Sequence, residues 1–553
     1  MDLRKFVFGF LSVAVWSCAS DSSQLDPALD AALNSITAGG FTESVRTLSS
    51  DEFEGRLPST LGEELTINYL RQRFVDMGIQ PGNGESFFQE VPLVEITSRP
   101  DAHLVITGRG PGMRLEYGVN SIVVTRRVVE RVELSESEMV FVGYGIVAPE
   151  YGWNDYQGLD VRGKTVVMLV NDPGFATQDS SLFNGNSMTY YGRWTYKYEE
   201  ASRQGAEAAL VIHQTEPAGY GWNVVSTGWS GPQFGLVAAD SNMSRVAVEG
   251  WISEGAARGI FALSHVDFDS VTAQAARPGF RAVPLIMRAS TTLNNTIKQS
   301  VSNNVLGLLR GSERPDEIVV YMAHWDHLGN DESIDGDGIY NGAADNATGT
   351  AAILEIAGAF VSLPQPPKRS ILFLAVTAEE QGLLGSAYYG ENPVYPKSNT
   401  VAAINIDGVN LYGEMNDITI VGMGNSELDD YVTEAAAAQG RVVRPDPEPE
   451  KGYFYRSDHF SFAKQGIPAL YTDNGIDHVE HGVEWTLERM AEYRAERYHQ
   501  PTDEFDPNWD VAGALQDIRL LFRVGYRLSN ESAFPNWNEG TEFRVLRDAM
   551  MED

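Results

Sequence analysis

The second half of the sequence alternates between short apolar runs and longer runs with helical spacing. The apolar runs predict strands at 305–309, 318–323, 371–376, 402–406 and 418–421. Helical spacing is clearest at 349–361, and 511–528 predicts a closing amphipathic helix. Strands that alternate with helices are typical of a mostly parallel sheet with helices on both faces. We therefore expect an α/β fold in three layers, built on a mixed, mostly parallel sheet.

The first half of the sequence divides into a helical part and a β-rich part. The helical part predicts two helices and a short strand, with apolar residues at helical spacing over 61–77. From 115 to 280 the sequence changes to short β-rich runs with many Gly, Tyr and Trp residues, interrupted by one predicted helix at 193–204. We expect 21–114 and 281–553 to form one α/β domain, and 115–280 to form a domain inserted into it.

The N-terminus has the pattern of an export signal. Arg4 and Lys5 precede an apolar run at 6–16, which is shorter than the roughly 20 residues that a membrane-spanning helix requires. Cys18 follows in a setting similar to a bacterial lipobox, although Trp16 is unusual there because that motif favours small residues. We expect residues 1–20 to be a signal peptide of the lipoprotein type. The protein would then be exported, either to the periplasm or to the outer membrane of a bacterium with Cys18 as its lipid anchor; soluble export after ordinary cleavage is the alternative.

Composition limits both the partners and the metal ligands. The sequence has 41 Lys and Arg residues against 76 Asp and Glu residues, which gives a formal net charge of −35. This acid excess argues against nucleic acid, because binding would require basic groups that replace the counterions of the phosphate backbone. Cys18 is the single cysteine, which excludes an intramolecular disulfide and a cysteine-based zinc site. Any metal site must therefore use His, Asp and Glu.

Residue types that bind metals follow several of the predicted strands. They occur in five clusters: His324-Trp325-Asp326, the loop 341–349 with Asp345, Glu379-Glu380, Asp407, and His499 with Asp503. The carboxyl ends of strands are where open α/β sheets build their sites. Any one cluster is compatible with an ordinary solvated or structural role. Their joint occurrence favours a metal site, because buried carboxylates are costly without a cation.

This ordered series of clusters resembles the co-catalytic di-zinc aminopeptidase family, which also contains the glutamate carboxypeptidases. The resemblance covers most of residues 300–510, including 456–460 and 466–468. Residues 38–95 resemble the N-terminal helices of that family, and 115–280 resembles a protease-associated domain. The resemblance implies a zinc exopeptidase-like fold and an enzyme that hydrolyses peptides.

The resemblance also implies which residues hold zinc and which perform the chemistry. Two zinc ions would be bound per chain, by His324 and Asp407 at one site, by Glu380 and His499 at the other, and by Asp345 at both. Glu379 would be the general base, and Asp326 would accept a hydrogen bond from the imidazole of His324. If Glu379 and Glu380 continue the extended backbone of the preceding strand, their side chains point to opposite sides.

The function that these residues favour is that of an aminopeptidase, which removes N-terminal residues from peptides. An enzyme of the glutamate carboxypeptidase type is one alternative; it would need basic residues that hold the carboxylates of the substrate, and Arg456 is a candidate. A non-catalytic receptor on the same fold is the other alternative. It is disfavoured because the sequence keeps all five implied ligands and the base.

Three further motifs are weaker signals. Residues 143–148 match a loose dinucleotide-binding pattern, but a proline stands where the helix should begin. Residues 331–336 resemble the start of a calcium loop, but Gly342 replaces the final Glu, so a Gly/Asp turn is the better interpretation. We expect Ser457-Asp458-His459 to support the site without reacting, and 453–455 either to line a substrate pocket or to pack in the core.

Overall fold

The structure is a computed structural model that describes residues 27–100, 103–108 and 110–552. The predicted signal peptide and Cys18 lie outside the described residues. Within the described part of the chain, no helix is both long and apolar enough to cross a membrane.

The main sheet of the C-terminal part has the strand order β13–β17–β14–β18–β21–β19–β20. β17, β14, β18 and β21 run parallel, whereas β13 and β19 are antiparallel to β17 and β21. The sheet is therefore mixed and mostly parallel, as the sequence predicts. The N-terminal segment contributes β1 Gln80–Pro81 and β2 Phe88–Pro100, and the strands of the C-terminal part are β13 Val283–Leu309, β14 Arg314–His324, β15 Gly329–Asn330, β16 Ile339–Tyr340, β17 Arg369–Val376, β18 Thr400–Asn405, β19 Asp417–Ile420, β20 Val442–Pro445 and β21 Ala469–Asp473.

Helices cover both faces of this sheet because its strands direct alternate side chains into two apolar cores. In β14, Tyr321 and Ala323 lie in one core, whereas Val320 and Met322 lie in the other. Residues of α1, α2, α3, α10, α12 and α15 fill the first core, and residues of α11 and α13 fill the second. The helices are α1 Pro27–Ser35, α2 Ala38–Leu48, α3 Leu61–Asp76, α10 Thr348–Ser362, α11 Leu384–Glu391, α12 Leu428–Ala437, α13 His459–Ala463, α14 Gly482–Glu496, α15 Ala512–Asn530 and α16 Arg544–Glu552. The three-layer prediction is confirmed.

The inserted part is a second sheet with the order β5–β12–β10–β9–β6. Its central strand β10 also divides its side chains between two cores, with Leu210 and Ile212 on one side and Ala209 and Val211 on the other. The hairpin of β3 His103–Gly108 and β4 Met113–Glu116 precedes the inserted part, whose strands are β5 Ser121–Val124, β6 Arg131–Phe141, β7 Val147–Ala148, β8 Trp153–Asn154, β9 Thr165–Leu169, β10 Ala208–His213, β11 Pro232–Leu236 and β12 Val248–Ser253. The helices of the inserted part are α4 Pro173–Thr177, α5 Trp194–Arg203, α6 Thr215–Ala218, α7 Trp222–Gly228, α8 Glu254–Leu263 and α9 Phe268–Ala275.

The inserted part contains more helix than the sequence analysis expected. The predicted helix at 193–204 is confirmed as α5, but α8 and α9 were not predicted. Two glycines within α8 lower its helix propensity and hide it from a reading of periodicity. Side-chain caps compensate at both helix starts, because Ser253 accepts a hydrogen bond from Ala256 N and Asp267 accepts one from Ser270 N.

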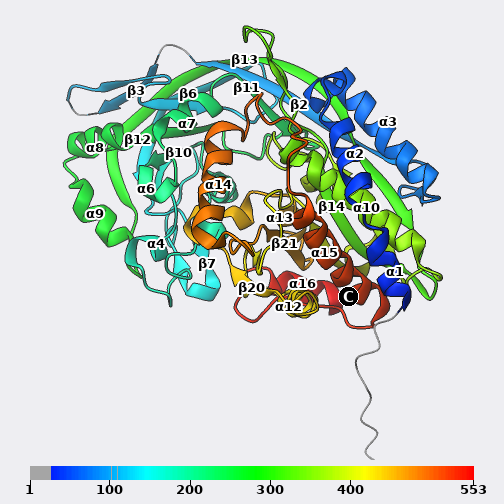
Figure 1. Cartoon of the computed structure of the whole chain (residues 1–553). Helices are drawn as coiled ribbons and strands as arrows, with labels where there is room; N and C mark the ends of the chain where they lie inside the picture. Colours follow the sequence, from blue (N-terminus) through cyan, green and yellow to red (C-terminus); the bar gives the residue numbers. More distant parts are fainter. Residues whose placement is uncertain (1–26, 101–102, 109, 553) are drawn as a thin grey trace, which may run out of the picture.

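One long strand joins the main sheet to the inserted sheet. β13 pairs with β17 through residues 305–309 and with β6 through residues 283–294. Between these segments β2 runs antiparallel to β13, pairing 88–100 with 293–305. Figure 1 shows β13 as a long green strand that extends over both parts of the molecule. The hydrogen-bonded sheet therefore has no break at the domain boundaries predicted near residues 115 and 280.

The two weak binding motifs form turns. After 143–148 the chain enters a three-residue 3-10 turn, Pro149–Tyr151, and not the α-helix that a dinucleotide site requires. At 331–336 the carboxylate of Asp331 accepts hydrogen bonds from the backbone N–H and the hydroxyl of Ser333, which is an ordinary Asx turn.

Candidate metal centre

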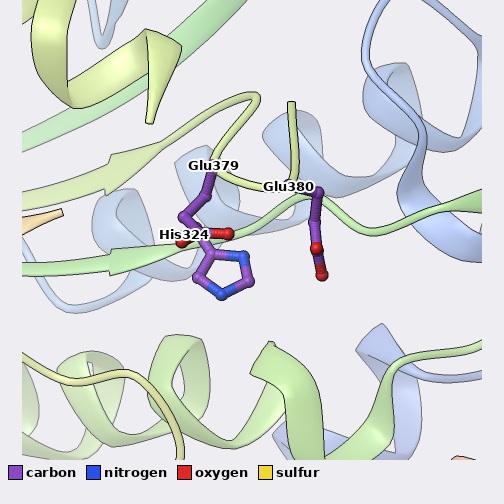
Figure 2. Close-up of side chains that lie close together, drawn as sticks. All are labelled: His324, Glu379 and Glu380. Atoms are coloured by element: carbon purple, nitrogen blue, oxygen red, sulfur yellow. The ribbon is translucent and has the colours of Figure 1, made fainter. Parts of the chain in front are cut away.

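The ends of parallel strands gather most of the predicted ligands. β14 ends at His324, Glu379 and Glu380 follow the end of β17, and Asp407 follows the end of β18. β14 lies between β17 and β18 and is parallel to both, so the three segments leave the sheet at the same edge. Figure 2 shows Glu379 beside His324 and Glu380 on the adjoining turn.

Asp345 reaches this edge from the loop that precedes α10. The next residue, Asn346, ties this loop to the loop after β18. Its Nδ2 donates to Ile406 O at 2.9 Å, and its Oδ1 accepts from the backbone N–H groups of Gly349 and Gly408, both at 2.8 Å. The start of α10 is thereby held against the loop that carries Asp407.

His499 and Asp503 belong to the loop after α14. The ring of His499 stacks on Tyr498 with 3.9 Å between centroids. The buried carboxylate of Asp503 accepts the backbone N–H groups of Ala344 and Asp345, each at 3.1 Å to Oδ2. Asp503 therefore positions the loop of Asp345, a role that its place in the sequence did not reveal.

The five predicted ligands form two groups that share Asp345. In the His324 cluster (His324, Asp345, Asp407), His324 Nε2 lies 3.2 Å from Asp407 Oδ1 and 3.3 Å from Asp345 Oδ1. In the His499 cluster (His499, Asp345, Glu380), His499 Nε2 lies 3.3 Å from Asp345 Oδ2 and 3.0 Å from Glu380 Oε2. Each oxygen of Asp345 thus faces a different histidine, as in a carboxylate that bridges two metal ions.

The chemistry of this centre fits metal ions. Four carboxylates, those of Asp345, Glu379, Glu380 and Asp407, meet in a space that is largely removed from water. Carboxylates gathered in this way are costly unless cations neutralise them. Imidazole and carboxylate are ligands that zinc accepts, and groups of three such residues here are close enough to hold one ion.

Glu379 and Glu380 are neighbours with opposite pKa shifts. Burial raises the pKa of Glu379 well above its usual range, and the nearby Asp407 raises it further. Burial alone would also raise the pKa of Glu380, but His327 and His499 lower it to about 2. Carboxyl groups whose pKa values are pushed apart are suited to different roles, one to exchange a proton and the other to stay ionised.

The backbone of this pair differs from the extended form considered above. Ala378 has φ 53°, and Glu379 begins a turn. The carboxylate of Asp326 stabilises this turn by accepting the backbone N–H of Glu379 at 3.0 Å and that of Glu380 at 3.4 Å. The two side chains therefore separate because the chain turns, and not because they alternate along a strand.

The predicted partner of the His324 imidazole is corrected in one detail. His324 Nδ1 lies 3.2 Å from the backbone oxygen of Asp326 but 3.8 Å from its carboxylate. The imidazole hydrogen bond thus goes to the main chain of Asp326, because the carboxylate is engaged by the Glu379 turn. Asp326 still lies directly behind the site.

The Ser457-Asp458-His459 segment supports the His324 cluster through its serine. Ser457 Oγ donates to Asp407 Oδ2 at 2.5 Å and accepts from Asn405 Nδ2 at 2.6 Å. Asp458 and His459 are fully buried. Of the three aromatic residues before this segment, Tyr453 lines the cleft, whereas Phe454 and Tyr455 are buried in the core.

Arg56 lies behind the site and was not predicted. Its guanidinium is fully buried and donates four hydrogen bonds to backbone oxygens: to Trp325 (2.8 Å), Leu48 (2.7 Å), Asn341 (2.6 Å) and Gly342 (2.8 Å). These oxygens belong to the loop after β14, to the end of α2 and to the loop of Asp345. The Arg56 guanidinium therefore links the loop after β14 to the loop of Asp345. No local sequence pattern predicts this role.

A cleft of about 590 Å³ opens onto the centre. Asp345, Glu379 and Asp407 lie at its base, and Arg489 and Tyr493 of α14 form part of its wall. Figure 1 shows α14 between the main and inserted parts of the molecule. The cleft therefore gives access to Glu379, the side chain whose pKa is raised by burial.

Comparison with known proteins agrees with the geometry. Residues 304–522 match the model of peptidase family M28, and all predicted ligands lie within this range. The chain contains a peptidase family M28 domain. The family resemblance expected from the sequence is confirmed.

Relatives of this domain carry the names of peptidases, and one of them is named as a zinc metalloprotease. Aminopeptidase NAALADL1 of Mus musculus is 33% identical over 138 residues, which are 24% of this chain and 17% of that protein. A "Probable zinc metalloprotease" of Pyrenophora teres f. teres (strain 0-1) is 35% identical over 130 residues, 24% of each chain. "Probable glutamate carboxypeptidase AMP1" of Arabidopsis thaliana is 34% identical over 134 residues, 24% of this chain and 17% of that protein. The chain thus matches less than a third of the length of each of these relatives.

Among solved structures, an aminopeptidase from Aneurinibacillus sp. strain AM-1 is 18% identical to this chain, with a TM-score of 0.48. The similarity covers 92% of this chain and 97% of that one.

Arg56 supplies a test of how the site is supported. Arg56→Met leaves four buried backbone oxygens without their donor and removes a positive charge near Asp326 and Asp503, so we expect the free energy of unfolding to fall by about 3–5 kcal/mol. Arg56→Lys keeps the charge but has fewer donors in a different geometry, and should lose less. Urea unfolding of both variants measures this. The exposed Arg162→Met is the control and should change stability by less than about 0.5 kcal/mol; an equally small loss for Arg56→Met would contradict the role assigned to Arg56.

Proposed function

We propose that this protein is a zinc-dependent exopeptidase that removes N-terminal residues from peptides with a free α-amine. The observation that carries this proposal is the pair of histidine–carboxylate clusters that share Asp345, with Glu379 beside them at the base of the cleft. One zinc ion would be held by the His324 cluster and a second by the His499 cluster. Zinc, when bound there, would supply Lewis-acid chemistry to the hydrolysis of a peptide bond.

Glu379 is the general base in this proposal. Its raised pKa reflects a buried carboxyl group that can take up a proton, and its position at the base of the cleft places it against a bound peptide. Glu379 takes a proton from the attacking water as the water oxygen bonds to the carbonyl carbon. When the C–N bond breaks, Glu379 returns that proton to the leaving amine. Asp326 assists by holding the backbone of the Glu379 turn.

The cleft offers acidic groups for the free amine of the substrate. Asp446 and Asp473 line it together with the ligand carboxylates. Glu448 also lines it but is paired with Lys451 and Arg494. Asp473 is partly buried, and this burial raises its pKa to about 6, so it is mainly ionised at neutral pH. A protonated α-amine is attracted by such a surface, whereas an acetylated N-terminus is not.

A second candidate function is favoured by Arg456, which lines the same cleft, and by the nearby Arg193 of the inserted part. Arg456 lines the cleft with its guanidinium 5.4 Å from the centre of the Tyr453 ring, and it forms no ion pair with a carboxylate of the described chain. Arg193 of the inserted part lies close enough to Arg456 that the two charges repel, and its buried Nε has no hydrogen-bond partner among the described residues. Two guanidiniums without acidic partners suit a carboxylate of the substrate, as a glutamate carboxypeptidase type of enzyme requires.

The inserted part, residues 115–280, has a supporting function in this proposal. It contains none of the proposed ligands, and it brings Arg193 to the face that meets Arg456. We propose that it is a protease-associated domain that shapes access to the cleft and does not take part in the chemistry.

The assignment of Glu379 and Glu380 to different roles is testable with a matched pair of variants. Glu379→Gln keeps the shape but removes the proton acceptor, so kcat should fall by about 10²–10⁴-fold while zinc stays bound. Glu380→Gln should instead lower the zinc content, and added zinc should restore part of the activity. Measuring kcat and zinc per chain for both variants decides between the roles. Loss of zinc from Glu379→Gln, or near-normal turnover, would show that the base is another residue.

The direction of attack is testable with blocked peptides. We expect hydrolysis of dipeptides and dipeptide amides with a free N-terminus, none of their N-acetylated forms, and loss of activity on treatment with a chelator. Release of C-terminal Glu from an N-acetylated dipeptide, with a KM that rises in Arg456→Gln, would favour the carboxypeptidase type instead. Zinc binding without hydrolysis of any of these peptides would favour a non-catalytic receptor.

We further propose that the protein is exported and anchored through Cys18, on the basis of the apolar run and the cysteine that follows it. An acyl chain together with a diglyceride anchors a protein stably, whereas one chain alone does not. Labelled fatty acid should be incorporated into the wild-type protein and not into Cys18→Ser. Equal labelling of both would exclude Cys18 as the site of attachment.

A further inference from the structure

His327 is a buried histidine at the site that none of the roles above includes. It lies three residues after His324, in the loop that follows β14, and its side chain is fully buried. Resting on the function proposed above, we propose that His327 is a positioning residue for the His499 cluster. Its Nδ1–H holds one oxygen of Glu380, so that the other oxygen stays directed at His499, where it would be available to a zinc ion.

The hydrogen bond that carries this proposal is short and fixes the tautomer. His327 Nδ1 lies 2.7 Å from Glu380 Oε1. Because an ionised carboxylate only accepts hydrogen bonds, the proton of this bond must reside on Nδ1. Nε2 of His327 is buried with no hydrogen-bond partner in the described part of the chain. Among the described residues, Glu380 is therefore the only hydrogen-bond partner of the His327 ring.

The ring of His327 is held in place by the backbone of Gly342. A Cβ atom at Gly342 would come within 2.5 Å of the ring atoms Cγ and Cδ2, so only glycine leaves room for the ring. Gly342 also has φ 52°, a conformation that glycine adopts without cost. The ring therefore cannot shift toward this loop, and its Nδ1 stays aimed at Glu380.

Glu380 lies between two histidines that take different oxygens. Oε1 bonds to His327, and Oε2 lies 3.0 Å from Nε2 of His499. The centroids of the two imidazole rings are 5.8 Å apart, with the carboxylate reaching both. Rotation of the carboxylate would break the contact with His327. Orientation of ligands by neighbouring hydrogen bonds is a general means of tuning metal affinity.

The His324 cluster has a separate support of the same kind. There, Ser457 Oγ holds Asp407 Oδ2 at 2.5 Å and leaves Oδ1 directed at His324. Each cluster thus has its own donor that fixes one carboxylate ligand, apart from the shared Asp345. A change at His327 should act on one metal site, and a change at Ser457 on the other.

Zinc titration of the metal-free full-length protein tests this proposal without recourse to activity. Asn places an amide N–H near the position of Nδ1, so His327→Asn should keep zinc affinity close to that of the wild type. Leu has a similar volume but no donor, so His327→Leu should weaken one of the two zinc ions by about 10- to 100-fold and leave the other unchanged. Ser457→Ala is the matched control and should weaken the other ion. Calorimetry with zinc, and zinc per chain after dialysis against chelators of graded strength, report both sites.

Three results would overturn the proposal. If His327→Asn loses zinc as strongly as His327→Leu, the ring is itself a ligand, for which the close grouping of His327, Asp345 and Glu380 leaves room. If neither variant changes zinc affinity, His327 has no role at the site. If the wild type binds fewer than two zinc ions, both this inference and the proposed function fail, whereas two zinc ions without hydrolysis would contradict the proposed function alone. Should His327→Leu not fold, as judged by circular dichroism of the metal-free protein, His327→Gln takes its place, because its amide extends past the Nδ1 position.

Discussion

The parallel pairing of β14 with β17 and β18 is the constraint on which the metal centre depends. These ladders bring three strand ends to one edge of the sheet, and the ligand side chains emerge within a few residues of those ends. A slip of one residue in β14 would exchange its two faces and direct His324 away from the edge. The strands resist such a slip because both faces are buried in separate apolar cores.

The negative charge gathered at this edge of the sheet determines which groups must surround the site. Carboxylates gathered away from water are destabilising in the absence of cations, and the chain supplies cationic and donor groups around them. Arg56 holds the loops from behind, Asn346 ties the start of α10, and Ser457 and His327 each fix one carboxylate. Hydrogen bonds to the main chain therefore hold the loops of the site in place, and hydrogen bonds from neighbouring side chains orient the carboxylate ligands.

Periodicity and family resemblance predicted the strands, the main helices and the residues that meet at the site, because both are local properties of the sequence. The supporting residues were not predictable in this way. Arg56 contacts segments that lie far from it in the sequence. The carboxylate of Asp326 binds the Glu379 turn and not the imidazole of His324, because Ala378 has a left-handed backbone conformation that starts this turn. The helices α8 and α9 were missed because side-chain caps define where they begin, and because two glycines lower the helix propensity of α8.

The length of β13 has a mechanical consequence for the inserted part. Domain closure usually occurs at a few residues that are free to change their backbone angles. Here the connection is a ribbon in which thirteen residues of β2 pair with β13 from 293 to 305, and rotation at any one of them would break ladder hydrogen bonds. Movement of the inserted part relative to the main part must then involve bending and twisting of this ribbon as a whole. The position of Arg193 relative to the metal centre therefore depends on the curvature of this ribbon and on direct contacts between the two parts, such as those of Tyr190 with Tyr455 and Phe460.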